Sequence, residues 1–182
     1  VMIPRMSELQ SKGRVREMIE LSVRAWEKLS LFYFPVYVVF LITAQTFITT
    51  LFTERYITAV PIFLINITLL PSYIFITDPI VRSYEYLGRF ILKIRVVIVL
   101  LMLGTLWFGK NHLDLTGVIA VVVITAFIER AITLYKIWKF VGFKMEDFAL
   151  MKNISRIGLV AAFSGLPAIA VYTLIKFQTA GF

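Results

Sequence analysis

The sequence predicts an all-α membrane protein, and its composition and its long apolar stretches both point to this class. Of the 182 residues, 59% are hydrophobic and only 16% are charged, and the mean hydropathy is +0.85. A soluble domain has about 45–50% apolar and about 25% charged residues. A chain of this length cannot hide the excess of apolar side chains in one core, so we expect it to lie in a lipid bilayer.

Five apolar stretches have about the 20 residues that a helix needs to cross a bilayer. We place these predicted spans at residues 29–52, 57–81, 90–108, 115–138 and 157–177. Their apolar residues follow a helical period and not the alternation of barrel strands, so helices are the expected structure. The prolines within these spans are Pro35, Pro61, Pro71, Pro79 and Pro167. Membrane helices tolerate such prolines because neighbouring groups satisfy the freed carbonyls.

The lysines and arginines alternate between the two sides of the predicted spans. Six precede the first span, and the following connections and the last segment carry one, four, one, six and one. Connections rich in Lys and Arg stay on the cytoplasmic side of a membrane. We therefore expect a multi-pass protein of the cytoplasmic (inner) membrane whose N-terminal segment and second and fourth connections are cytoplasmic. This pattern explains the net charge of +8 without a nucleic-acid partner.

Residues 1–28 are predicted to form a cytoplasmic connector, and residues 29–182 a five-helix transmembrane bundle. Most charged side chains of the connector avoid one apolar stripe, as in an amphipathic helix at a membrane surface. The residues of this stripe are Met18, Leu21, Ala25 and Leu29. The first letters, VMIP, look like the end of a preceding helix, so we expect the chain to be part of a longer protein.

A second amphipathic linker, FKMEDFALMKNISR, precedes the last span. Its Asn153 and Ser155 are candidates for the N-cap of the last helix, because a short polar side chain can accept a hydrogen bond from the first free N–H groups.

Side chains with catalytic chemistry are scarce in this sequence. It has no cysteine, and its one histidine, His112, lies beside Asp114 in a short external connection. A His–Asp pair can exchange protons, but neither a nucleophile nor a metal ligand accompanies it, so a solvated loop histidine is the simpler interpretation. The sequence contains no glycine-rich phosphate loop and no metal-ligand spacing. We expect no enzyme activity, cofactor or metal.

Polar side chains inside the spans are the candidates for a functional site, because ionisable residues at membrane depth usually face a bundle interior or an aqueous cavity. The candidates are Gln45, Asn66, Asp78, Arg82, Glu129 and Arg130. Asp78 and Arg82 are four residues apart and can pair on one helix face. Pro79 between them is expected to weaken the helical hydrogen-bond ladder.

Glu129 and Arg130 interrupt an otherwise apolar span. Adjacent helical residues point about 100° apart, so these two side chains cannot simply pair with each other. Counted from Leu115, Glu129 lies about 21 Å deep, roughly two thirds of the way across. Arg130 can extend to the cytoplasmic headgroups, whereas Glu129 needs a partner or water. Two interpretations stay open: a structural hydrogen bond between helices, or a place in a polar cavity.

Three stretches, taken in order, carry a resemblance to a known family. They are VMIPRMSELQSKGRVREMIELSVRAWEKLSLFYFPVYVVFL, TTLFTERYITAVPIFLI and DLTGVIAVVVITAFIERAITLYKIWKFVG. The matching positions are Pro4, Ser7, Gly13, Arg24, Pro35, Phe52, Tyr56, Ala59, Gly117 and Ala120. Together they resemble the bacterial polysaccharide flippases, the O-antigen and exopolysaccharide translocases of the multidrug/oligosaccharidyl-lipid/polysaccharide exporter superfamily.

The resemblance implies a two-lobe transporter of about twelve to fourteen helices, of which this chain would form most of the C-terminal lobe. Such a protein flips undecaprenyl-pyrophosphate-linked oligosaccharide by alternating access, as needed for lipopolysaccharide and other polysaccharides. Arg82 and Arg130 would then face the pyrophosphate, and Glu129 and Asp78 would be charge partners or ion-coupling groups. The expected partners are the lipid-linked oligosaccharide, membrane lipids, and the polysaccharide polymerase and ligase machinery.

Other functions stay open beside this one. A peptidoglycan lipid flippase or a multidrug exporter would belong to the same superfamily. A membrane-embedded glycosyltransferase usually carries acidic motifs in sizeable loops, whereas the longest loops here are short and basic. A structural membrane protein without transport would leave the charges inside the spans unexplained.

Overall fold

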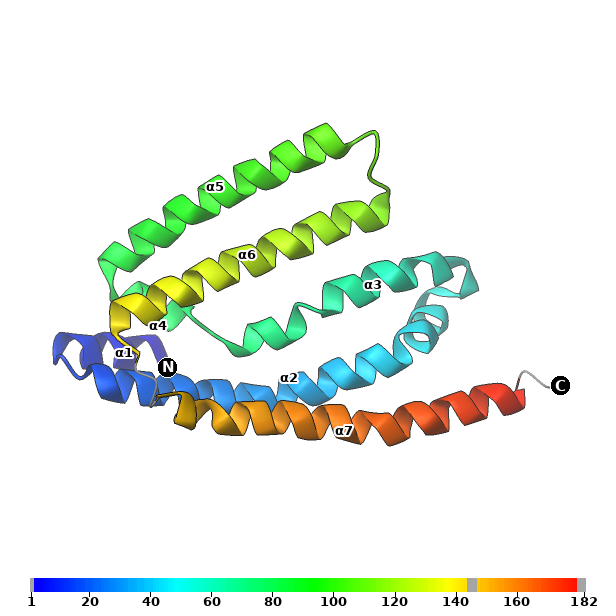
Figure 1. Ribbon diagram of the computed structural model, residues 1–182, viewed down its shortest axis with the longest axis horizontal. Helices are drawn as coiled ribbons and strands as arrows, with labels where there is room; N and C mark the ends of the chain where they lie inside the picture. The colour runs from blue at the N-terminus through cyan, green and yellow to red at the C-terminus, as the bar shows by residue number, and fades with distance from the viewer. Residues whose placement is uncertain (1, 144–146, 180–182) are drawn as a thin grey trace.

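The computed structural model describes residues 2–143 and 147–179, and over these residues the chain folds into helices joined by short connections, which confirms the all-α prediction (Figure 1). The helices are α1 (Met2–Ser11), α2 (Val15–Phe52), α3 (Val60–Ile67), α4 (Asp78–Ser83), α5 (Glu85–Gly109), α6 (Leu115–Val141) and α7 (Asp147–Thr179), with the short 3-10 helices η1 (Glu54–Ala59) and η2 (Leu70–Ile74).

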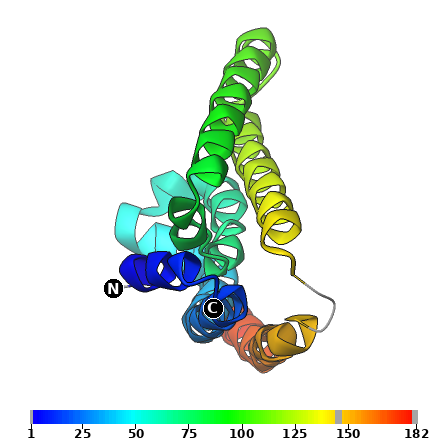
Figure 2. The same ribbon diagram turned by 90° about the vertical axis from the view of Figure 1, so that its left-hand side faces the viewer.

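The long helices lie side by side in the order α5, α6, α3, α2 and α7 (Figure 1). Helices α1 and α4 lie at one end of this array, where α6 also ends and α5 and α7 begin. Figure 2 looks onto this end. The segments predicted to be cytoplasmic therefore gather at a single end. That this end faces the cytoplasm stays a prediction.

Four stretches of the described chain have the length and hydropathy of a membrane span: Val15–Phe52, Glu54–Ile74, Glu85–Gly109 and Leu115–Val141. Few of their residues are buried within the chain, as expected for helices that face lipid or further helices. The protein is thus an all-α, multi-pass membrane protein. The fifth predicted span, residues 157–177, lies within α7, but part of its side chains falls outside the described residues.

The second predicted span is broken and does not form one helix. Helix α3 ends at Ile67, and α4 begins only at Asp78, with η2 between them. The prolines explain the breaks, because Pro61, Pro71 and Pro79 each stand in the first two positions of a new helix, where a missing N–H costs nothing. The prediction that Pro79 weakens the interior of a helix is therefore wrong, since Pro79 starts one.

The connector and the first span form the single helix α2, whose buried face differs from the predicted stripe. Met18 is buried as expected, but the other members of the stripe are only partly buried. The fully buried residues near it are Ile19, Ser22, Val23, Trp26 and Ser30. The stripe was expected to lie on a membrane surface. In the structure, this end of α2 packs against α1, η2 and α7 instead.

The last helix begins earlier than predicted. Helix α7 starts at Asp147, so the described part of the second linker is helical, and Asn153 and Ser155 are interior residues and not N-caps. Residues 144–146 of the linker lie outside the described residues. The Asn153 side chain instead donates to the carboxylate of Glu27 at 2.9 Å. Asp147, 2% exposed, forms an ion pair with Arg16. These two contacts attach the start of α7 to α2.

Helices α2 and α7 run in the same direction and approach closely along their length (Figure 1). A β-carbon on Gly158 would come within 3.1 Å of the Phe34 ring, and one on Gly165 within 2.5 Å of the Val38 Cγ1 atom. Ala161, between these glycines, is buried. Small residues at such positions let membrane helices pack with their backbones close together, which keeps this pair of helices in place beside the break.

Candidate functional site

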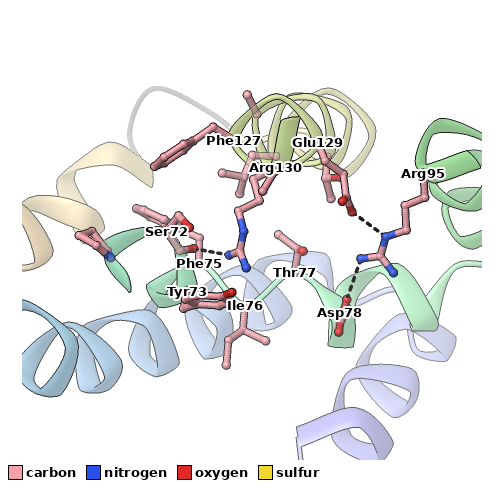
Figure 3. Close-up of a pocket in the computed structure, with 15 residues that line it drawn as sticks. Ser72, Tyr73, Phe75, Ile76, Thr77, Asp78, Arg95, Phe127, Glu129 and Arg130 are labelled. Atoms are coloured by element: carbon pink, nitrogen blue, oxygen red, sulfur yellow. Dashed lines mark hydrogen bonds and ion pairs between the residues drawn. The ribbon is translucent and has the colours of Figure 1, made fainter. Parts of the chain in front are cut away.

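A cavity of about 740 Å³ lies beside the break, between the broken segment, α5 and α6 (Figure 3). Its walls are residues 71–78 of the broken segment, Arg95 of α5, and one face of α6 from Ala126 to Leu134. Non-helical backbone at membrane depth is tolerated only where protein covers it or where it lines a water-filled cavity. The break and the cavity therefore belong together physically.

Arg130 crosses from α6 to the broken segment. Its Nη1 atom donates to the carbonyl oxygen of Ser72 at 2.7 Å, and its guanidinium lies 4.1 Å from the ring centroid of Tyr73. Tyr73 in turn stacks on Tyr33 of α2, with 6.4 Å between the ring centroids. An arginine over an aromatic face is attracted by the ring quadrupole. Arg130 therefore ties α6 to the break and, through two rings, to α2.

Trp26 supports the broken segment from the opposite side. Its indole Nε1 donates to the carbonyl oxygen of Ile76 at 3.0 Å, and its ring packs edge-on against Phe75 at 5.4 Å. Ile76 lies between η2 and α4, where no helical ladder is available to its carbonyl. The hydrogen bond from Trp26 is part-buried, and a backbone carbonyl at membrane depth needs a partner. Side chains of α2 and α6 thus supply hydrogen bonds that a continuous helix would have made.

Arg95, Glu129 and Asp78 form a charged triad across three helices (Figure 3). The Arg95 Nε atom donates to the Glu129 Oε1 atom at 2.6 Å, and the Arg95 Nη2 atom lies 3.9 Å from the Asp78 Oδ1 atom. Glu129 is 27% exposed, whereas Arg95 and Asp78 are 53% and 62% exposed. With Arg130, the cavity holds two guanidinium groups and two carboxylates, so its formal charges balance.

The structure brings three of the predicted site residues together: Asp78, Glu129 and Arg130 all line the cavity. Asp78 pairs with Arg95 and not with Arg82, the partner suggested by their spacing. Because α4 begins at Asp78, this carboxylate extends from the free end of a helix toward α5 (Figure 3). Glu129 and Arg130 have separate partners, as expected for neighbours on a helix.

The other three predicted residues are not part of this cavity wall. Arg82 is exposed on α4 and is in none of the ion pairs of the described chain, and Asn66 is exposed near the end of α3. Gln45 lies on α2, where its backbone carbonyl accepts from the Thr49 hydroxyl. A substrate role for these residues stays a prediction without support from the cavity.

Arg95 is the site residue that sequence reasoning missed. It is one of the four basic residues that the charge alternation assigns to the second connection, together with Arg82, Arg89 and Lys93. In the structure it lies ten positions after the first residue of α5, about 15 Å along the helix. The signal was present, since Arg95 lies within the predicted span 90–108 and has no acidic residue within four positions. A cation at that depth without a local partner requires one from another helix.

The His112 region has a structural explanation. Asp114 is the N-cap of α6, and its carboxylate accepts from the backbone N–H of Gly117 at 2.7 Å. A carboxylate at a helix N-terminus satisfies free N–H groups and opposes the positive end of the helix dipole. Within the described residues, no group of three or more His, Cys, Asp or Glu side chains could hold a metal ion.

Fold and site thus define a multi-pass helical membrane protein with a charged cavity beside a broken helix. In comparison with known families, residues 1–61 match the family model described as "Polysaccharide biosynthesis protein". This match covers about a third of the chain, from α1 into α3, and it supports a role in polysaccharide biosynthesis or export. No curated protein and no solved structure matched the chain.

Proposed function

We propose that this protein is a transporter and not an enzyme, and that it flips undecaprenyl-pyrophosphate-linked oligosaccharides across the cytoplasmic membrane for polysaccharide biosynthesis. The described helices would form most of the C-terminal lobe of a two-lobe translocase that works by alternating access. The observation that carries the proposal is the charged cavity at membrane depth beside a broken helix. The family match over residues 1–61 supports the polysaccharide part of it.

Broken membrane helices are a recurring way to build a transport site, because they free backbone groups and leave room for a polar ligand. Here the break interrupts the α-helix for about three turns between Ile67 and Asp78. The space beside it is lined by arginine, carboxylate and threonine side chains within otherwise apolar spans. Such a cavity can hold a hydrated, polar headgroup while the apolar outer faces of α5 and α6 stay in lipid.

The arginines suit the chemistry of a lipid-linked diphosphate. A guanidinium presents N–H groups in a planar fork that matches phosphate oxygens. The sugars of the headgroup would contact the polar groups of the cavity wall, including the side chains of Thr77 and Thr133. In alternating access, the second wall would come from the other lobe. Polymerase and ligase enzymes of the same biosynthesis would use the flipped lipid.

The proposal is tested by filling the cavity without removing any of its polar contacts. Ala126 lies one turn before Glu129 and Arg130 on the cavity face of α6, and Ala126→Trp places a large ring in that space. Ile124→Trp is the matched control, because Ile124 is on the same helix and is 56% exposed. The full-length protein with each change is expressed in a strain that lacks its polysaccharide translocase.

We expect Ala126→Trp to reduce surface polymer at least tenfold per folded molecule in the membrane, and Ile124→Trp to leave it near the unmodified level. The readouts are surface polysaccharide and membrane abundance of the protein. Equal export by both variants at equal abundance would mean that the cavity does not carry the substrate. Failure of the unmodified full-length protein to restore polymer would contradict the transport function itself.

A further inference from the structure

Arg95 and Arg130 face the same cavity but are held very differently (Figure 3). Arg130 donates to a backbone carbonyl and lies with its guanidinium over Tyr73. Its position is thus fixed by the backbone of the break and by a ring. Among the described residues, the polar contacts of the Arg95 side chain are with two acids, Glu129 and Asp78. An arginine held by side chains alone can exchange partners without disturbing the backbone.

The contacts of Arg95 also leave donors unused. Its Nε atom donates to Glu129, but its Nη2 atom is 3.9 Å from Asp78, which is beyond the range of a hydrogen bond. An arginine has five N–H donors, and among the described residues the Nε bond is the one hydrogen bond that the Arg95 side chain makes. Arg95 lines the cavity and its side chain is 53% exposed. Ion pairs of this exposure are weak, so a stronger anion can displace them.

We propose that Arg95 recognises the anionic phosphate group of the transported lipid, and that Glu129 and Asp78 hold Arg95 until that anion replaces them. The proposal rests on the transport function proposed above and names the residue that binds the phosphate of the headgroup. Its ligand class is a phosphate or diphosphate ester on a hydrocarbon chain. The planar fork of the guanidinium donates to two oxygens of one phosphate, a geometry that an ammonium group cannot match.

Two consequences follow from this exchange of partners. Glu129 and the incoming anion carry the same sign and compete for one cation, so removal of the Glu129 charge raises the affinity for the anion. The Arg95 contacts also join α5 to α6 and to α4. When the anion takes Arg95, these links between helices are released, and substrate entry loosens the helices around the cavity.

The test measures binding directly, on the purified full-length protein in detergent. The probe is farnesyl diphosphate, and farnesol is the uncharged probe that shares its chain. The variants are Arg95→Gln and Glu129→Gln. The matched pair is Arg89→Gln and Glu85→Gln, because Arg89 and Glu85 form an exposed ion pair on the same helix, α5, away from the cavity. Calorimetric titration gives the dissociation constants.

We expect Arg95→Gln to weaken diphosphate binding at least tenfold and Glu129→Gln to tighten it about threefold or more, with farnesol binding unchanged. The Arg89 and Glu85 variants should bind both probes like the unmodified protein. If Arg95→Gln lowers the yield of folded protein, Arg95→Lys keeps the charge and removes the fork. It should then fold normally and still bind the diphosphate several-fold more weakly.

The outcomes separate this proposal from the proposed function. If the diphosphate binds the unmodified protein and all Arg95 variants equally, Arg95 is a structural residue and the proposal is wrong, while transport stands. Weaker binding by Glu129→Gln would also overturn it, because the acid would then assist the anion and not compete with it. If the unmodified protein does not discriminate diphosphate from farnesol, the cavity does not take the headgroup, and the proposed function loses its basis.

Discussion

Gly165 of α7 lies so close to Val38 of α2 that a β-carbon on the glycine would come within 2.5 Å of the valine Cγ1 atom. Val38 is β-branched and has one strongly preferred rotamer in a helix, so it cannot turn aside. The contact joins two neighbours of the array, α2 and α7, which are the first and the last long helix in the sequence. It is a packing contact that depends on the absence of a single methyl group.

Replacing Gly165 tests this packing. We expect Gly165→Ala to lower the free energy of unfolding by about 1–3 kcal/mol through overpacking. Gly104→Ala in α5 is the control, because no atom lies within 4 Å of its added methyl group. That change should be neutral or stabilise the helix by up to about 1 kcal/mol. Unfolding of the purified protein in detergent measures both. If the double variant Val38→Ala/Gly165→Ala regains part of the lost free energy of unfolding, the clash lies between these two residues. If Gly165→Ala stabilises the protein as much as Gly104→Ala does, the close approach is contradicted.

Trp26→Phe tests whether the broken segment depends on a side-chain donor. The phenyl ring keeps most of the packing on Phe75 but removes the hydrogen bond to the Ile76 carbonyl. We expect a loss of about 0.5–1.5 kcal/mol in unfolding free energy, the usual net contribution of one hydrogen bond. Trp107→Phe, at a tryptophan that is 69% exposed, should change stability little. If Trp26→Phe lowers the free energy of unfolding no more than Trp107→Phe does, water replaces the indole as the donor to the Ile76 carbonyl.

A double-mutant cycle at Arg130 and Tyr73 separates the two interpretations of the charges in α6. The contact between guanidinium and ring predicts a coupling of about 0.5–2 kcal/mol between Arg130→Gln and Tyr73→Leu in thermal unfolding. Because Arg130 also holds the Ser72 carbonyl, we expect Arg130→Gln to reduce membrane abundance and export together. A loss of export at normal abundance would instead assign Arg130 a direct role in the cavity.

Single cysteines test the orientation, because the natural sequence contains none. Ser11 and Asn111 lie in segments predicted to be on opposite sides of the membrane, and both are exposed in the structure. A membrane-impermeant thiol reagent on intact cells should label Asn111→Cys and not Ser11→Cys, since the connections rich in Lys and Arg stay inside. Permeabilised cells should give labelling at both positions. The opposite pattern on intact cells would reverse the topology.

The sequence was sufficient for the parts of the fold that depend on local pattern. Apolar length located four stretches of the described chain that can span a membrane, and the pair Glu129 and Arg130 was recognised as two residues that need separate partners. The break was missed because a proline at the first positions of a helix and one within a membrane helix look alike in a sequence. Pro71 and Pro79 were therefore placed inside a continuous span.

The remaining differences arise from contacts between distant residues. Arg95 and Glu129 are 34 positions apart, Trp26 and Ile76 are 50 apart, and Arg130 and Ser72 are 58 apart. Helical periodicity carries no information at such separations. For the same reason, the buried face of α2 was assigned to the membrane surface, whereas η2 and α7 determine it.

The break between Ile67 and Asp78 also has a mechanical consequence. A continuous helix resists twisting and bending because each turn is bonded to the next, whereas here that series of bonds stops and restarts. The segment from α3 through η2 to α4 can therefore bend between its helices, and a rotation of α3 is not passed on to α4 by helical hydrogen bonds. The side chains of Trp26 and Arg130 hold the break by hydrogen bonds to its backbone, and they belong to two different helices, α2 and α6. A relative displacement of α2 and α6 is thus concentrated at one height in the membrane, beside the cavity.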